Sequence, residues 1–327
     1  MPTKRVAVRG MAVRRPGVAR RAWSLAIHGG AGEPREHAGA RAAEQARRDV
    51  LHDVLAAGAR ALAAGAASVD VVENAVRALE DSPLFNAGKG AVFNARGAHE
   101  LEASIMDGRT LAAGAVANLR GIKNPVTLAR WVMERTPHVC LEGDGAIAFA
   151  QEQGMALVAP AYFWTEETWN ALKSARLGTG TARHQPPPDG TVGAVALDTG
   201  GDVAAATSTG GTARKLPGRV GDSSMIGAGT YASNASCAVS CTGLGEYFIR
   251  AAAARDICAL VEYAGLTPRA AATRVLRKIE RLGGCGGAIV VDRRGAVVCV
   301  FDTALMYRGT VTHERPIRTA ARSRPAT

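Results

Sequence analysis

A proline- and glycine-rich run at residues 176–190 divides this chain into two parts of different composition. The run holds Pro186-Pro187-Pro188 and three glycines, which favour an irregular linker over a helix or a strand. Directly after it comes Gly190-Thr191-Val192-Gly193-Ala194-Val195-Ala196, the start of a half rich in small residues, threonine and glycine. We therefore predict a mobile linker at 176–190 that leads into a tightly packed strand.

The junction between Gly190 and Thr191 suggests a chemical role. A threonine inside a chain is a poor nucleophile, whereas an N-terminal threonine carries a base of its own, the free α-amine. Glycine before the bond also permits a strained backbone. Our hypothesis is that the protein cuts its own Gly190–Thr191 bond, which leaves residues 23–190 and 191–327 as two subunits of one folded unit.

The net charge of +11 lies in the two tails. Residues 1–22 hold seven lysines and arginines and no acid, and residues 308–327 hold five arginines against one glutamate, so the body between them is neutral. Charged tails are usually solvated. We expect a disordered leader at 1–22, a disordered tail at 312–327 and no nucleic-acid partner; a basic-tailed nucleic-acid-binding protein on an inactive enzyme fold is the alternative.

Other features concern location. The chain has no apolar run of about 18 residues and no signal peptide, so we expect neither a membrane partner nor export. Its six cysteines are scattered in apolar surroundings, which is typical of reduced thiols in a cytoplasmic protein. Cys237 and Cys241 have the spacing of a strand and lack a partner pair, so zinc is not expected.

Apolar periodicity and turn residues predict the secondary structure. Before the linker we expect a strand ending at the Gly29-Gly30 pair and then the following elements: helices 38–64, 69–81, 124–134, 144–153 and 162–175, and strands 99–107, 111–118 and 138–141. After it we expect these elements: strands 191–198, 202–208, 222–231, 236–242, 287–292 and 296–303, and helices 245–263 and 267–282. This order favours mixed or antiparallel sheets with helices outside them.

The chemistry-bearing residues are threonines, because no Gly-x-Ser-x-Gly, HExxH, Walker or paired CxxC motif is present. Threonines next to glycine or another small residue form one set: Thr191, Thr207, Thr209, Thr212 and Thr242. Arg219 and Asp222 stand three apart in a Gly/Pro loop. A guanidinium can grip a carboxylate and a carboxylate can hold an ammonium, so the pair can receive an α-amino acid head group. An exposed local salt bridge is the other interpretation.

Several motifs in one order carry a resemblance to a known family. They are His28-Gly29-Gly30-Ala31-Gly32, Pro83-Leu84-Phe85-Asn86-Ala87-Gly88, Ala103-Ser104-Ile105-Met106-Asp107-Gly108, Gly190-Thr191-Val192-Gly193, Ala206-Thr207-Ser208-Thr209-Gly210-Gly211, Leu216 to Asp222, Cys241-Thr242-Gly243 with Gly245-Glu246, and Met306-Tyr307-Arg308. Between Ser24 and Arg308 the chain resembles the plant-type L-asparaginases, or isoaspartyl (β-aspartyl) peptidases, of the N-terminal nucleophile hydrolase superfamily.

The resemblance implies a role for each matching residue. Thr191 would be the nucleophile, freed by cleavage after Gly190, and Thr209 would tune its hydroxyl. The Thr242 hydroxyl and the Gly243 N–H would form the oxyanion hole. Arg219 would hold the substrate α-carboxylate, and Asp222 and Gly245 the α-ammonium.

The resemblance also implies an architecture and partners. The fold would be α+β, a four-layer αββα sandwich cut autoproteolytically into two chains, assembled as a homodimer of cleaved αβ protomers. The substrates would be L-asparagine and β-aspartyl dipeptides, with glycosylasparaginase activity as the alternative. No cofactor would serve catalysis; a structural sodium ion would be held by backbone carbonyls of these residues: Leu79, Glu80, Ser82, Phe85, Ala87 and Lys89.

Four positions depart from the usual pattern of these relatives. They are Asp189, Glu102, Cys285 and the run Thr303-Ala304-Leu305, and they leave the preference between the two substrates open.

Overall fold

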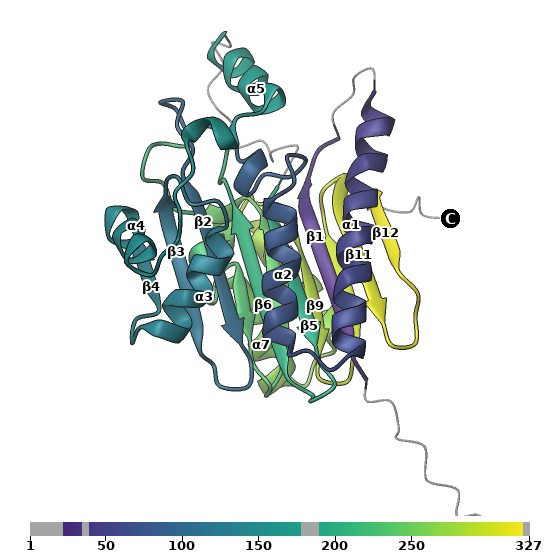
Figure 1. The fold of residues 1–327 in the computed structure, drawn as a ribbon. Helices are drawn as coiled ribbons and strands as arrows, with labels where there is room; N and C mark the ends of the chain where they lie inside the picture. The colour runs from purple at the N-terminus through teal and green to yellow at the C-terminus, as the bar shows by residue number, and fades with distance from the viewer. Residues whose placement is uncertain (1–21, 35–38, 178–189, 323–327) are drawn as a thin grey trace, which may run out of the picture.

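Two β-sheets lie face to face in this chain, with helices on their outer sides (Figure 1). The computed structural model describes residues 22–34, 39–177 and 190–322. Within them the fold is mixed α+β, as the sequence predicts. The leader 1–21 and residues 178–189 of the expected linker lie outside the described residues.

The larger sheet has eight strands, and its centre is formed by β1, β5 and β6. In spatial order the strands are β12 (Arg318–Arg322), β11 (Leu305–Thr312), β1 (Ser24–Gly32), β5 (Val192–Leu197), β6 (Val203–Thr209), β2 (Leu101–Asp107), β3 (Ala113–Leu119) and β4 (Cys140–Glu142). All neighbours pair antiparallel except β3 and β4. The sheet thus mixes strands from both sides of Thr191.

The smaller sheet has four antiparallel strands from the second half of the chain. They are β10 (Val297–Phe301), β9 (Gly286–Asp292), β8 (Cys237–Gly243) and β7 (Thr230–Ala232). Strand β9 packs on β1, and β8 packs on β5 and β6. The smaller sheet therefore covers one face of the central strands.

Helices cover the outer face of each sheet (Figure 1). On the larger sheet they are α1 (Ala40–Ala63), α2 (Ser68–Glu80) and α3 (Pro125–Arg135), with α4 (Gly143–Glu152) beside β3. On the smaller sheet they are α6 (Gly245–Ala251), α7 (Ala253–Ala264) and α8 (Pro268–Arg281). Helix α5 (Glu166–Leu177) and the short 3₁₀ helices η1 (Gly88–Gly90), η2 (Pro160–Phe163) and η3 (Asp222–Ser224) complete the set.

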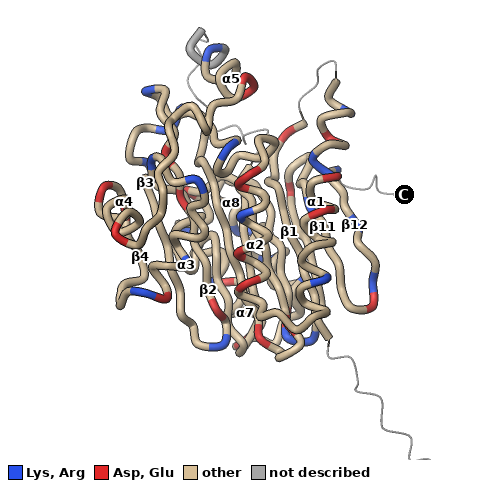
Figure 2. The backbone as a smooth tube through the Cα atoms, viewed as in Figure 1, with Lys and Arg blue, Asp and Glu red and all other residues tan. Residues whose placement is uncertain are grey.

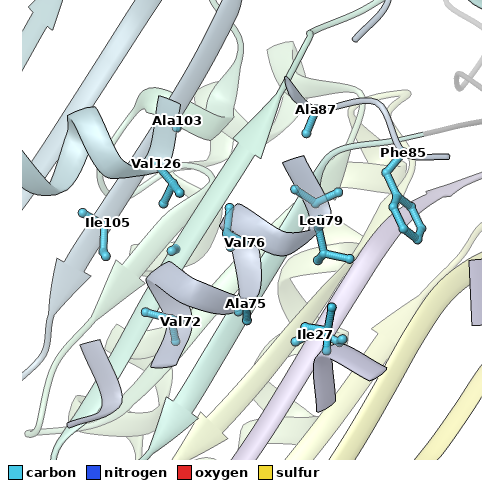
Figure 3. Close-up of a cluster of buried hydrophobic side chains, with 14 of the residues drawn as sticks. Ile27, Val72, Ala75, Val76, Leu79, Phe85, Ala87, Ala103, Ile105 and Val126 are labelled. Atoms are coloured by element: carbon cyan, nitrogen blue, oxygen red, sulfur yellow. The ribbon is translucent and has the colours of Figure 1, made fainter. Parts of the chain in front are cut away.

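The central strands are buried on both faces, because helices cover one face of the larger sheet and the smaller sheet covers the other. Side chains alternate between these two faces along each strand. In β5, Ala194 and Ala196 pack under the helices, whereas Val195 and Leu197 face the smaller sheet. Val72, Val76 and Leu79 of α2 project onto the face that carries Ala194 and Ala196 (Figure 3). The core thus has a helix–sheet layer and a sheet–sheet layer.

Charged residues of both signs are interspersed over the helices α1 to α4 in the view of Figure 2. This distribution agrees with the neutral body indicated by the sequence. No helix among the described residues is long and apolar enough to cross a membrane.

Three expectations about the elements are wrong. Strand β1 continues through the glycines to Gly32, with an irregular register between His28 and Ala31. The helix expected at 245–263 is broken at Ala252, whose φ is 48°. The region 222–231 begins as η3, not as a strand.

The tail expected to be disordered at 312–327 is also partly ordered. Residues Arg318–Arg322 form β12, which pairs with β11 at the edge of the larger sheet. Arg308 fixes this edge because its guanidinium donates to the carbonyls of Met306 and Ala321, both at 2.8 Å. Residues 323–327 lie outside the described residues.

Candidate active site

Thr191 stands immediately before β5, in the middle of the larger sheet, and is 7% exposed. Its neighbour Gly190 is packed tightly. A side chain on Gly190 would come within 2.8 Å of the Thr242 hydroxyl and 2.9 Å of the Gly30 backbone. The bond expected to be cut therefore lies directly against one half of the expected oxyanion hole.

A small pocket opens over Thr191. Its lining includes Gly190, Thr191, Thr209, Arg219, Asp222 and Gly243, together with Asn86, Gly211 and Thr212. Six of the eight residues expected to act in catalysis, binding or cleavage thus meet in one cavity. The other two, Thr242 and Gly245, lie directly behind its lining.

Thr242 is oriented by a hydrogen bond. Its Oγ1 accepts the Ala31 N–H at 3.1 Å, so its own proton is left to donate elsewhere. Next to it, Gly243 has φ of 146°, and a side chain there would meet the Cys285 carbonyl at 2.4 Å. Only glycine fits at this position. The two residues can present an O–H and an N–H to the same carbonyl oxygen.

Thr209 ends β6 on the opposite strand. Its Oγ1 accepts the Gly211 N–H at 3.0 Å, which again leaves the hydroxyl proton to donate into the pocket. Asn86 fixes the same turn, because its Nδ2 donates to the Gly211 carbonyl at 2.7 Å. The loop that carries Thr209 and Gly211 is thereby held against the 83–90 segment.

Arg219 and Asp222 are not an exposed salt bridge. Asp222 is 4% exposed, and the Arg219 side chain is 17% exposed. Arg219 donates through Nε to Glu246 at 2.9 Å. Within the described residues, the Asp222 Oδ2 atom is buried and has no hydrogen-bond partner. An unpartnered acceptor beside a guanidinium is what a ligand with both an ammonium and a carboxylate would satisfy.

The pKa of Asp222 is raised to about 7, mainly by burial and also by the nearby Glu102, while Arg219 acts to lower it. Gly245, at the start of α6, leaves room for the Arg219 and Asp222 side chains to pack close to the helix. A side chain there would come within 2.7 Å of Asp222 Oδ1 and 3.0 Å of Arg219 Nη2. Gly245 therefore lies against both members of the pair.

Behind Thr191 lies a buried histidine that our sequence analysis left without a role. His28 of β1 places Nδ1 at 2.9 Å from the Thr191 carbonyl and Nε2 at 2.9 Å from the Ser240 hydroxyl. Burial lowers the pKa of His28 to about 3, so the ring is neutral and carries one proton. A carbonyl only accepts, which puts the proton on Nδ1 and makes Nε2 the acceptor from Ser240.

From Ser240 a chain of buried hydroxyls runs between the two sheets. Ser240 contacts Thr207 at 2.7 Å, Thr207 contacts Thr230 at 2.5 Å, and Thr230 contacts Ser104 at 2.8 Å. Ser104 ends the chain at the Ser223 carbonyl, 2.6 Å away. The chain thus connects the backbone of Thr191 with the backbone next to Asp222.

The loop expected to bind sodium follows α2 and includes η1. Its carbonyls already accept internal hydrogen bonds, Phe85 from Ala87 N–H at 2.9 Å and Ala87 from Gly90 N–H at 3.2 Å. Each carbonyl oxygen has a second lone pair, and hard oxygen donors suit an alkali cation. The described residues hold no group of three or more His, Cys, Asp or Glu side chains that could hold a metal ion.

Sequence reasoning missed four residues that shape the site: His28, Asn86, Glu102 and Ser240. All four stand inside the quoted motifs or one residue from them, so the motifs carried the signal. Their partners could not be read from the sequence, because His28 and Ser240 are 212 residues apart.

The pocket thus brings the Thr191 hydroxyl together with Gly243 and the Arg219–Asp222 pair, an arrangement that suits a hydrolase. The profile of the family described as Asparaginase matches residues 21–320. The chain belongs to the asparaginase family, which confirms the resemblance drawn from the motifs.

Similar proteins span most of this chain and most of their own lengths. The isoaspartyl peptidase of Salmonella typhimurium is 50% identical over 292 residues, which cover 87% of this chain and 93% of the relative. The probable isoaspartyl peptidase/L-asparaginase 2 of Arabidopsis thaliana is 41% identical over 319 residues, which cover 89% of this chain and 96% of the relative. The plant-type L-asparaginase of Pyrococcus furiosus is 43% identical over 288 residues, which cover 84% of this chain and 91% of the relative.

Proposed function

We propose that this protein is an amidohydrolase that cleaves the side-chain amide of L-asparagine and the isopeptide bond of β-aspartyl dipeptides. The observation that carries the proposal is the pocket in which Thr191 meets Arg219 and Asp222. Arg219 holds the α-carboxylate and Asp222 the α-ammonium, so the side-chain carbonyl points to Thr191. The names of the relatives agree with both substrates.

In the proposed reaction the α-amine of Thr191 accepts the proton of its own hydroxyl as Oγ1 attacks the side-chain carbonyl. The Thr242 hydroxyl and the Gly243 N–H stabilise the oxyanion. The leaving ammonia or amine takes the proton, and an ester on Thr191 remains. Water then attacks the ester, which releases aspartate and restores the hydroxyl.

The active form arises by self-cleavage in the same pocket. The Thr191 hydroxyl attacks the Gly190 carbonyl, the peptide shifts from nitrogen to oxygen, and water hydrolyses the ester. The close packing of Gly190 against Thr242 supports this step. The products are residues 1–190 and 191–327, two subunits of one αββα sandwich.

The substitution Thr191→Ala tests both steps. We expect the variant to run as one uncut chain on a denaturing gel and to release no ammonia from L-asparagine. The matched control is Thr273→Ala on the surface of α8, which should be cut and active. A wild-type chain that stays uncut after long incubation but is fully active would exclude the mechanism.

The same proposal includes a structural sodium ion at the carbonyls of the Leu79–Lys89 loop. Gly88 and Gly90 leave no room for side chains there, since Cβ atoms would meet the carbonyls of Glu80 and Phe85 at 2.3 and 2.2 Å. Thermal unfolding in sodium chloride and in choline chloride of equal ionic strength tests it. An equal midpoint in the two salts would argue against the ion.

We also propose that the cleaved protomers form a homodimer in the cytoplasm, without nucleic acid. Family resemblance is the basis for this assembly. Light scattering of the cleaved protein measures the mass, and a monomer would contradict the proposal.

A further inference from the structure

We propose that Glu102 is the positioning residue of the substrate clamp: it holds the segment that carries Arg219 and Asp222 at the distance from Thr191 that the amino-acid head group requires. This inference rests on the proposed function. It concerns a side chain that does not line the pocket.

The carboxylate of Glu102 grips the clamp segment on both sides of Asp222. Glu102 stands on β2, opposite Thr209 of β6, and is 1% exposed. Its two oxygens accept the Gly221 N–H at 2.8 and 3.1 Å, and Oε2 also accepts the Ser224 hydroxyl at 3.0 Å. Since Gly221 and Ser224 flank Asp222, the carboxylate fixes where the Asp222 side chain starts.

Two cations, the buried Lys215 and the partly buried Arg219, lie beside the same carboxylate. Lys215 Nζ and Arg219 Nη1 each lie 3.9 Å from Glu102 Oε1. Lys215 also donates to the Glu100 carbonyl at 2.8 Å. Charges buried in protein need partners, so loss of the carboxylate would leave two like charges to repel each other.

Strand β2 acts as a platform for this segment. Ser104 is two residues from Glu102 on the same face of β2 and donates to the Ser223 carbonyl at 2.6 Å. β2 also pairs with β6, the strand that carries Thr209. A rigid strand thus connects the clamp with the catalytic edge of the pocket.

Glu102 also sets the charge of the clamp. Groups from several elements face Asp222: Glu102 from β2, Arg219 from its own loop, Glu246 from α6 and Cys241 from β8. Glu102 and Glu246 favour the protonated form of Asp222, and Arg219 favours the carboxylate. Removing the Glu102 charge alone therefore shifts the pH at which Asp222 becomes able to hold an ammonium.

The test compares Glu102→Gln, which keeps the shape and removes the charge, with Glu102→Asp, which keeps the charge on a shorter side chain. At pH 8.5 we expect Glu102→Gln to raise KM for L-asparagine at least about tenfold, because bonds to a charged group are lost. We expect kcat to stay within about threefold, since Thr191 and its neighbours are untouched. Glu102→Asp should raise KM less.

A pH profile separates positioning from general destabilisation. In Glu102→Gln the acid limb of the profile of kcat/KM should move to lower pH, because burial still raises the Asp222 pKa but the Glu102 charge no longer adds to it. Glu73→Gln on α2 is the matched control, a partly buried carboxylate remote from the pocket, and should change neither KM nor the profile.

The outcomes are distinct. If folded Glu102→Gln has the wild-type KM and acid limb, the inference is overturned. If Glu102→Gln does not fold, Ser224→Ala replaces it, because that variant removes one hydrogen bond of the three; unchanged KM in both Ser224→Ala and Glu102→Asp then overturns the inference. If Arg219→Ala itself leaves KM unchanged in an active enzyme, the proposed function fails instead.

Discussion

His28 and the hydroxyls behind Thr191 form a chain whose protons can be counted. Six contacts connect the Thr191 carbonyl to the Ser223 carbonyl, and both ends only accept. The neutral imidazole and four hydroxyls supply five protons. One contact therefore lacks a proton, and with the His28 proton on Nδ1 and Ser240 donating to Nε2 that contact lies beyond Ser240. The chain is a directed structure and not a set of independent bonds.

The first prediction follows from the middle of this chain. Thr207→Val keeps the shape of the side chain but leaves the Ser240 and Thr230 hydroxyls without their shared partner. We expect the free energy of unfolding to fall by about 1–3 kcal/mol, the cost of stranding buried polar groups. Denaturant unfolding measures it, with Thr273→Val on α8 as the control. A loss no greater than that of the control would show that the chain contributes nothing to stability.

The second prediction concerns Asp222, whose pKa is raised to about 7 by burial. On the proposed function its carboxylate holds the α-ammonium of the substrate, so KM should rise about tenfold for each pH unit below 7. Steady-state kinetics from pH 5 to 9 measures this, and a KM that is flat across the range would contradict the assignment.

The stability of the folded chain should change with pH in the opposite sense to substrate binding. Because the folded-state pKa of Asp222 is raised, the folded chain retains a proton that the unfolded chain has released between about pH 4 and 7. Stability from this group is therefore lost as the pH rises through that window. Asp222→Asn removes the titration, so its melting temperature relative to wild type should be higher at pH 8 than at pH 5.

The residues that line the pocket were predictable from the sequence only where a motif carried them. Thr191, Arg219 and Asp222 stood out by their types and their spacing. Glu102 was noted only as a departure from the usual pattern, because its contacts are hydrogen bonds to Gly221 and Ser224, about 120 residues away in the chain. Which buried carboxylate holds which loop is decided by strand pairing.

At the scale of the elements, helix starts were partly predictable. Prolines mark the first turns of α3 and α8, and Thr267 caps α8 by accepting the Ala270 N–H. Ser68 and Asn124 are not caps by their side chains. The acceptors come from other elements instead: Asp198 Oδ2 takes the Ser68 N–H at 2.8 Å, and Glu80 takes the Val126 N–H at 3.0 Å.

Asp198 gives the third prediction. It follows β5 and, besides capping α2, accepts the N–H groups of Gly200 and Asp202 at 2.8 and 3.1 Å. Asp198→Ala should lower the free energy of unfolding by about 1–3 kcal/mol, since a cap and a turn are lost together. Chemical denaturation measures it, against Asp53→Ala on the exposed face of α1. Equal stability of the two variants would mean that α2 needs no cap.

The break between α6 and α7 and the edge strand β12 were the least predictable features of the secondary structure. Ala252 interrupts the helical run in a left-handed conformation that glycine or asparagine would have signalled and alanine does not. Strand β12 consists of Arg318-Thr319-Ala320-Ala321-Arg322, too polar and too short to be recognised. It exists because β11 offers an edge to pair with.

At the scale of the whole molecule, the two expected subunits are interleaved in one sheet. Strand β1 of the first lies between β11 and β5 of the second, and β6 of the second pairs with β2 of the first. Arrangement of this kind could not be predicted from the sequence, because it depends on contacts between distant segments.

The interleaving gives the fourth prediction. Cleaved protein should elute from a sizing column as one species, since separation would break three strand pairings inside the core. The fragments should separate only in denaturant. Elution as two species in native buffer would contradict the topology.

The position of β1 also has a consequence for the history of each molecule. Thr191 obtains its surroundings, the Ala31–Thr242 bond among them, only after β1 has entered between β11 and β5. On the proposed mechanism, an unpaired precursor has no means to cut itself. The Gly190–Thr191 bond then stays intact in every molecule that never completed assembly. Once cleavage is complete, the ratio of uncut to cut chain in a preparation therefore measures the folding yield.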